Sequence, residues 1–165
     1  MKRVLVIAGI VCLLLVAQSA LLPALRLFGV APDLLFVFLI FWSAGRRRWE
    51  GAAMGFITGL LQDLTLGGTV GIFAFAKTLS GFLCAWIPWH PRESNPLMSG
   101  MILFSIGLAH QIIVFGLGSS ESTGGFGRLF LRYGLPSLVY TLVAGLAFYV
   151  ISTGFQRWLY RNRDR

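Results

Sequence analysis

Four ionisable side chains lie in otherwise apolar stretches of the chain: Asp33, Asp63, Lys77 and His110. Charged groups inside a bilayer are unfavourable, so such residues are candidates for function if these stretches span a membrane. Carboxylate, ammonium and imidazole groups at similar depth can form ion pairs or orient a bound partner. Three amide side chains at similar depth extend this polar cluster: Gln18, Gln62 and Gln111.

Each of the four also has a structural interpretation. Asp33 follows a proline and is placed to cap a helix start through its exposed amides. Asp63 and Lys77 flank the expected tight turn Gly67-Gly68, so we predict that they form an ion pair between adjacent helices. A histidine such as His110 on an apolar helix is more often a hydrogen-bonded packing residue than a ligand.

Motifs for other chemistries are missing from the sequence. There is no phosphate-binding loop, no HExxH motif and no cysteine pair at metal spacing. His90 is expected at the opposite interface from the polar cluster, so a metal site is not predicted. We therefore expect neither an enzyme nor a bound cofactor. The net charge of +8 comes without a nucleic-acid-binding motif, and attraction to anionic lipid accounts for it.

The elements that must position these residues follow from composition. Of 165 residues, 56% are hydrophobic and 12% are charged. A soluble domain has about 45–50% apolar residues with glycine included and about 25% charged ones, so a soluble globule is excluded. Disorder requires the opposite bias. Runs such as VLVIAGIVCLLLVA are apolar on every side rather than alternating, which predicts membrane-spanning helices and not a β-barrel.

The predicted fold is an all-α membrane protein, a bundle of six transmembrane helices in a single polytopic domain over residues 1–165. Prolines and glycines mark the breaks between segments, and Pro136 is expected in the first turn of the last helix. The longest connection is expected at 119–133. The six segments are about 4–22, 30–44, 51–66, 70–89, 97–118 and 134–155.

The basic residues predict the orientation. With the N-terminus inside, ten fall on the cytoplasmic side: Lys2, Arg3, Arg46, Arg47, Arg48, Arg92, Arg157, Arg161, Arg163 and Arg165. Three fall on the other side: Arg26, Arg128 and Arg132. Both termini are therefore expected in the cytoplasm. An alternative reading takes the first segment as a cleaved signal peptide, which would leave five spans.

A second pattern concerns helix packing. Gly51, Gly55 and Gly59 recur every fourth residue and so share one helix face, on which a neighbouring backbone can approach closely. The next step of the same spacing reaches Asp63. Packing within the bundle is the favoured interpretation, although the glycine face would also permit a homodimer.

These residues carry a family resemblance. The order Pro32-Asp33, then Gly51-x-x-x-Gly55-Phe56-x-x-Gly59-Leu60-x-x-Asp63, then a glycine-rich turn ending at Gly71 resembles the rod shape-determining protein MreD. The motif covers about residues 32–82. Lys77 is not part of the family pattern. The length, the short loops and the basic C-terminus also fit.

The resemblance implies a non-enzymatic scaffold subunit of the bacterial cell-elongation machinery in the cytoplasmic (inner) membrane. Such proteins associate with the bitopic protein MreC. Through it they couple MreB filaments to a RodA-type glycosyltransferase and a class B penicillin-binding protein, which build lateral peptidoglycan. The family is also similar in fold to the substrate-binding (S) components of energy-coupling-factor vitamin transporters, which implies a cavity between helices.

Two other functions stay open on the sequence alone. The first is a substrate-binding subunit of a transporter for a vitamin or another small solute. A vitamin pocket should hold several convergent polar groups, and the sequence offers few. The second is a protein that handles membrane lipid, which only the apolar character of the bundle supports. If the cavity instead receives a partner segment, Asp33 and Asp63 are expected to orient it.

Overall fold

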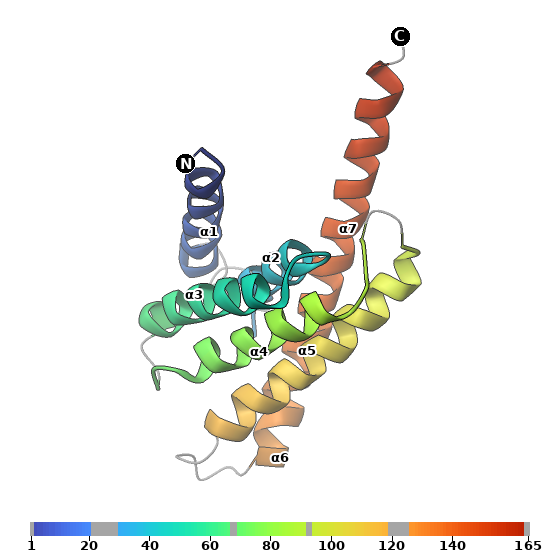
Figure 1. Ribbon diagram of the computed structural model, residues 1–165. Coiled ribbons are helices and arrows are strands. Elements are labelled where there is room, and N and C mark those ends of the chain that lie inside the picture. Colours follow the sequence, from blue (N-terminus) through green and yellow to red (C-terminus); the bar gives the residue numbers. More distant parts are fainter. Residues whose placement is uncertain (1, 21–29, 67–68, 92–93, 119–125, 164–165) are drawn as a thin grey trace.

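The structure, a computed structural model, describes residues 2–20, 30–66, 69–91, 94–118 and 126–163. This part of the chain forms six helices (Figure 1). The first five are α1 (Lys2–Ala20), α2 (Leu34–Ser43), α3 (Arg48–Leu66), α4 (Ile72–Trp86) and α5 (Pro96–Gly118). The sixth is a long helix composed of α6 (Phe126–Leu129), a π-helical turn (Phe130–Gly134) and α7 (Leu135–Arg163). The prediction of an all-helical fold is confirmed for these residues.

Helix α2 is the central helix of the core. Its ten residues are apolar on every side, a pattern typical of a helix that is surrounded by others. Leu35, Leu39 and Ile40 are completely buried. The helix contacts α1, α3, α4 and α7. Each of its ends can therefore contribute to a cavity between helices.

Helices α3 and α4 run antiparallel and make the most extensive contact in the structure (Figure 1). A Cβ atom at Gly51 would overlap the backbone of Gly81, and one at Gly55 would overlap the backbone of Lys77. A Cβ at Gly59 would likewise overlap the start of α4. The three glycines therefore let two backbones meet directly, and this contact fixes where Lys77 lies along α3.

The sixth helix differs from the prediction. Helix is already present at Phe126, so the expected connection 119–133 and the expected helix start at 134 are wrong over these residues. Pro136 lies inside the continuous helix and not in its first turn. A proline removes one backbone hydrogen bond and crowds the carbonyl four residues earlier. The π-helical turn Phe130–Gly134 ends two residues before Pro136, and the wider turn accommodates the proline without ending the helix.

Two of the described helices, Pro96–Gly118 and Phe126–Thr153, are long and apolar enough to cross a membrane. Val4–Ala20, Leu34–Ser43 and Ile72–Trp86 are shorter apolar helices. Large apolar side chains are exposed along the outside, for example Leu5, Leu97 and Ile151 at about 70% each. Gly67-Gly68, Arg26, Arg92 and Arg165, used above for the turn and the orientation, lie outside the described residues.

Candidate functional site

Asp33 lies at the N-terminus of α2 and contacts several helices at once. Its Oδ1 accepts a hydrogen bond from the Phe36 amide at 2.8 Å, which is the capping role that the sequence predicts. Its own amide donates to the Thr141 Oγ1 of α7 at 3.0 Å. The side chain is 14% exposed, so one face of the carboxylate is accessible.

Lys77 reaches Asp33 from α4. Its Nζ lies 2.9 Å from Asp33 Oδ1, and the lysine side chain is completely buried. The predicted partner of Lys77 was Asp63, and this prediction is wrong. Proximity across a turn does not decide the pairing, because the rotation of α4 about its axis points Lys77 toward α2.

Asp63 has a different role, at the start of α4. Its Oδ2 accepts hydrogen bonds from the amides of Gly71 and Ala74, both at 2.9 Å, and its Oδ1 accepts one from Phe73 at 3.1 Å. The N-cap residue Gly71 has no side chain to do this and adopts a positive φ of 107°. The last turn of α3 therefore supplies the cap of α4, and Asp63 is only 2% exposed.

His110 approaches Asp33 from α5. Its Nε2 lies 4.0 Å from Asp33 Oδ2, and its ring centroid lies 4.7 Å from that of Phe36. The side chain is buried, and its Nδ1 has no hydrogen-bond partner among the described residues. The structure thus brings Asp33, Lys77 and His110 together. No group of three metal-ligating side chains is found in the described part of the chain.

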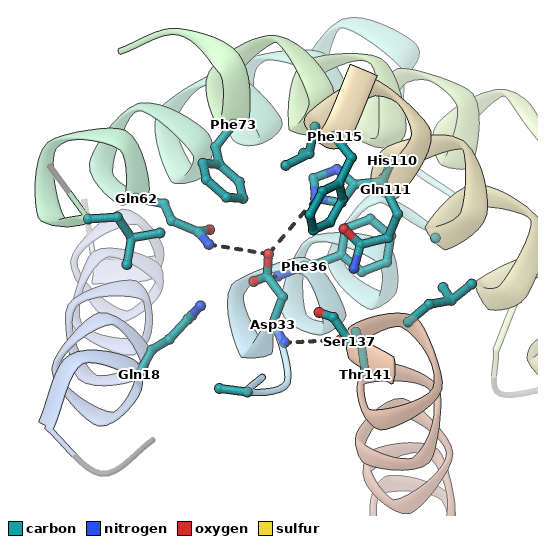
Figure 2. Close-up of a pocket in the computed structure, with 15 residues that line it drawn as sticks. Gln18, Asp33, Phe36, Gln62, Phe73, His110, Gln111, Phe115, Ser137 and Thr141 are labelled. Carbon is teal, nitrogen blue, oxygen red and sulfur yellow. Dashed lines mark hydrogen bonds and ion pairs between the residues drawn. The ribbon is translucent and has the colours of Figure 1, made fainter. Parts of the chain in front are cut away.

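The accessible face of Asp33 opens into a cavity of about 220 Å³, which we call the Asp33 cavity (Figure 2). Its walls come from α1, α2, α3, α4, α5 and α7, and neither Lys77 nor Asp63 lines it. Figure 2 shows Gln62 and His110 directed toward the Asp33 carboxylate. The polar lining residues are Gln18, Asp33, Gln62, His110, Gln111, Ser137 and Thr141.

The amide side chains around this cavity are incompletely satisfied. Gln62 Nε2 donates to Asp33 Oδ2 at 3.4 Å, while its Oε1 has no partner among the described residues. Gln18 Oε1 is likewise unpaired. Buried polar groups are normally hydrogen-bonded, so these amides are available to a ligand. Lys77 already supplies the counter-charge of Asp33, and the unpaired amides beside it are neutral. The site is therefore suited to non-covalent recognition of a polar group.

Sequence reasoning identified the polar cluster but not all of the walls. Ser137 and Thr141 form a small-residue series with Gly145, and such a series reads equally well as helix packing. In the structure Thr141 holds the backbone of Asp33, and Ser137 lines the cavity one turn away. A small polar residue that faces a charged one across the bundle is the signal that distinguishes a cavity wall from helix packing.

The comparison with family models decides the relationship. The model described as rod shape-determining protein MreD matches residues 1–159. The chain belongs to the MreD family. This places it among membrane proteins with a role in rod shape determination, and the family is not known as an enzyme family. No curated protein and no solved structure matches the chain.

Proposed function

We propose that the protein is a non-enzymatic scaffold subunit of the cell-elongation complex and that it binds a bitopic MreC-like protein. Through this partner it couples MreB filaments to the RodA-type glycosyltransferase and the class B penicillin-binding protein. The family membership supports this role. In this proposal the chain is a multi-pass protein of the inner membrane, and its cavity resembles that of the transporter S components.

The Asp33 cavity is the observation that carries the proposal. It combines apolar walls such as Phe36, Phe73 and Leu138 with unpaired amides beside a carboxylate. Apolar walls supply affinity, and a few polar groups supply orientation. A partner helix with one polar side chain among apolar ones would meet both requirements. In this role Asp33 contacts the partner, whereas Asp63 acts indirectly by holding α4 in place.

Orientation follows from the arginine-rich turn between α2 and α3. In this proposal Arg46, Arg47 and Arg48 face the cytoplasm, as the positive-inside bias requires. Both termini then lie in the cytoplasm, and α1 begins and α7 ends toward the same side in Figure 1. The Asp33 cavity lies at the other end of α2, in the outer half of the membrane.

The test is a pull-down of the tagged protein from its native membrane in mild detergent, with bound proteins identified by mass spectrometry. We expect an MreC-like bitopic protein, with wall synthases in smaller amounts. Recovery of a membrane coupling subunit and two ATPases instead would overturn the scaffold and establish the transporter alternative.

A matched pair of variants connects the partner to the cavity. Ser137→Leu fills the Asp33 cavity, and Ser105→Leu makes the same change on the exposed face of α5. We expect the bitopic partner to be lost with the first variant and retained with the second, while both elute normally from size-exclusion chromatography. Retention of the partner by a folded Ser137→Leu protein would show that the cavity is not its binding site.

A further inference from the structure

A second and larger cavity, of about 520 Å³, lies at the opposite end of α2. We call it the Arg46 cavity. It is formed by the end of α2, by the turns that follow α2 and α4, and by α7. Its lining residues are Phe38, Phe41, Trp42, Ala44, Arg46, His90, Pro91, Phe148, Ser152 and Thr153. Arg46 and His90 carry basic groups, and none of these ten lining residues is acidic.

Arg46 is held in place at the cavity wall. Its Nε donates to the Trp42 carbonyl at 2.9 Å, and its guanidinium carbon lies 4.1 Å from the centroid of the Trp42 ring. Arg46 forms an ion pair with Glu50 at 3.9 Å from one terminal nitrogen, a distance too long for a hydrogen bond. The terminal nitrogens therefore retain donors for another acceptor.

His90 lies against Gly45, the residue that precedes Arg46. Gly45 has a φ of +71°, and a Cβ at this position would lie 3.0 Å from His90 Nε2. A glycine here thus allows the turn after α2 to pack against an imidazole from the turn after α4. The Trp42 side chain lines the same wall, and its Nε1–H is buried without a partner among the described residues.

The remaining walls are aromatic and continue onto the outer surface of the bundle. The rings of Phe41 and Phe148 lie 5.1 Å apart, and Phe148 is 46% exposed. On the next turn of α7, Val150 and Ile151 are more than 60% exposed. The cavity therefore has hydrogen-bond donors at one side and an apolar surface that leads away from it.

This combination selects the ligand chemistry. Guanidinium and imidazole N–H groups suit phosphate oxygens, and an apolar surface beside them suits a hydrocarbon chain. Basic pockets between helices on the cytoplasmic side recognise lipid headgroups in the same way. We propose that the Arg46 cavity binds the phosphate of an anionic phospholipid, with Arg46 and His90 on the phosphate and Phe41 and Phe148 along the acyl chain.

The experiment is native mass spectrometry of the delipidated full-length protein, titrated with phosphatidylglycerol and, separately, with phosphatidylcholine. We expect tighter binding of phosphatidylglycerol, and a loss of about 10-fold or more in affinity for Arg46→Gln. Arg47→Gln is the matched control, because it removes the same charge one residue away without lining the cavity. Its affinity should stay within about twofold of the unmodified protein.

Three results would overturn the assignment. Equal losses for Arg46→Gln and Arg47→Gln would indicate unspecific attraction to the basic turn. Equal affinity for the two lipids would remove the role of the charge. Inorganic phosphate that binds as tightly as phosphatidylglycerol would make this a site for a free anion. If Arg46→Gln does not fold, His90→Gln carries the same test, because His90 also lines the cavity and is exposed.

Discussion

Lys77 and Asp33, 44 residues apart in the sequence, form an ion pair inside the helix bundle with Nζ 2.9 Å from Oδ1. The pair connects α4 to the N-terminus of α2, where Asp33 also receives a hydrogen bond from its own helix. One carboxylate thus serves as helix cap, counter-charge and cavity wall.

Removal of one partner should be more harmful than removal of both. Lys77→Met leaves the Asp33 carboxylate buried without its counter-charge, and we expect a loss of about 3–5 kcal/mol in the free energy of unfolding. The double variant Asp33→Asn/Lys77→Met should recover much of this loss. Unfolding curves in detergent give the free energy of unfolding for the unmodified protein, the two single variants and the double variant, which together form the cycle.

Asp63→Asn provides the matched control for this cycle. Since Asp63 caps α4 and does not pair with Lys77, its combination with Lys77→Met should not rescue stability. A coupling as large for Asp63 as for Asp33 would contradict the observed pairing.

Loss of the Asp63 cap should act locally on α4. Asp63→Ala leaves the amides of Gly71, Phe73 and Ala74 without their acceptor, whereas Asp63→Asn keeps one oxygen. We expect faster hydrogen exchange in a peptide over residues 71–76, strongest for alanine, and a stability loss of about 1–3 kcal/mol. Unchanged exchange in this peptide for Asp63→Ala would refute the capping role.

The close contact of α3 and α4 predicts a steep dependence on side-chain size. Gly55→Ala places a methyl group onto the Lys77 backbone, which cannot yield as a flexible side chain would. We expect a loss of about 1–3 kcal/mol and a lower unfolding temperature. Gly116→Ala is the control, because nothing lies within 4 Å of a Cβ there. Similar unfolding temperatures for the two variants would argue against direct backbone packing.

Thr141 should contribute through a single hydrogen bond. Thr141→Val keeps the shape but leaves the Asp33 amide without its acceptor, at an expected loss of about 1–3 kcal/mol. Thr65→Val makes the same change at an exposed position of α3, where the hydroxyl donates to the Leu61 carbonyl of the preceding turn. The difference between the two variants in their loss of unfolding free energy isolates the contact between α2 and α7. A difference near zero would contradict this contribution of Thr141.

Local patterns predicted much of this structure. The apolar run before Ser43, the four-residue glycine spacing and the position of Asp33 after a proline each depend on neighbours along the chain. Their consequences, a helix in this segment, a close helix pair and a capped N-terminus, are present in the structure.

Features that depend on helix rotation were harder to predict. Lys77 lies closer to Asp63 than to Asp33 in sequence, and only the orientation of α4 decides between them. The start of the last helix was misplaced because Pro136 normally marks a first turn, and the π-helical turn that tolerates it has no clear sequence signature. The Arg46 cavity forms where the turn after α2 meets the turn after α4. No sequence pattern near Arg46 predicts that His90 lines the same cavity.

The ion pair of Lys77 also bears on how the chain enters the bilayer during synthesis. Asp33 emerges from the ribosome first and has no counter-charge until α4 has been made. Helix α4 has only 15 residues and carries the lysine, so it is a poor candidate for insertion on its own. We therefore expect α2, α3 and α4 to leave the translocation machinery as one unit, with Asp33 and Lys77 already paired.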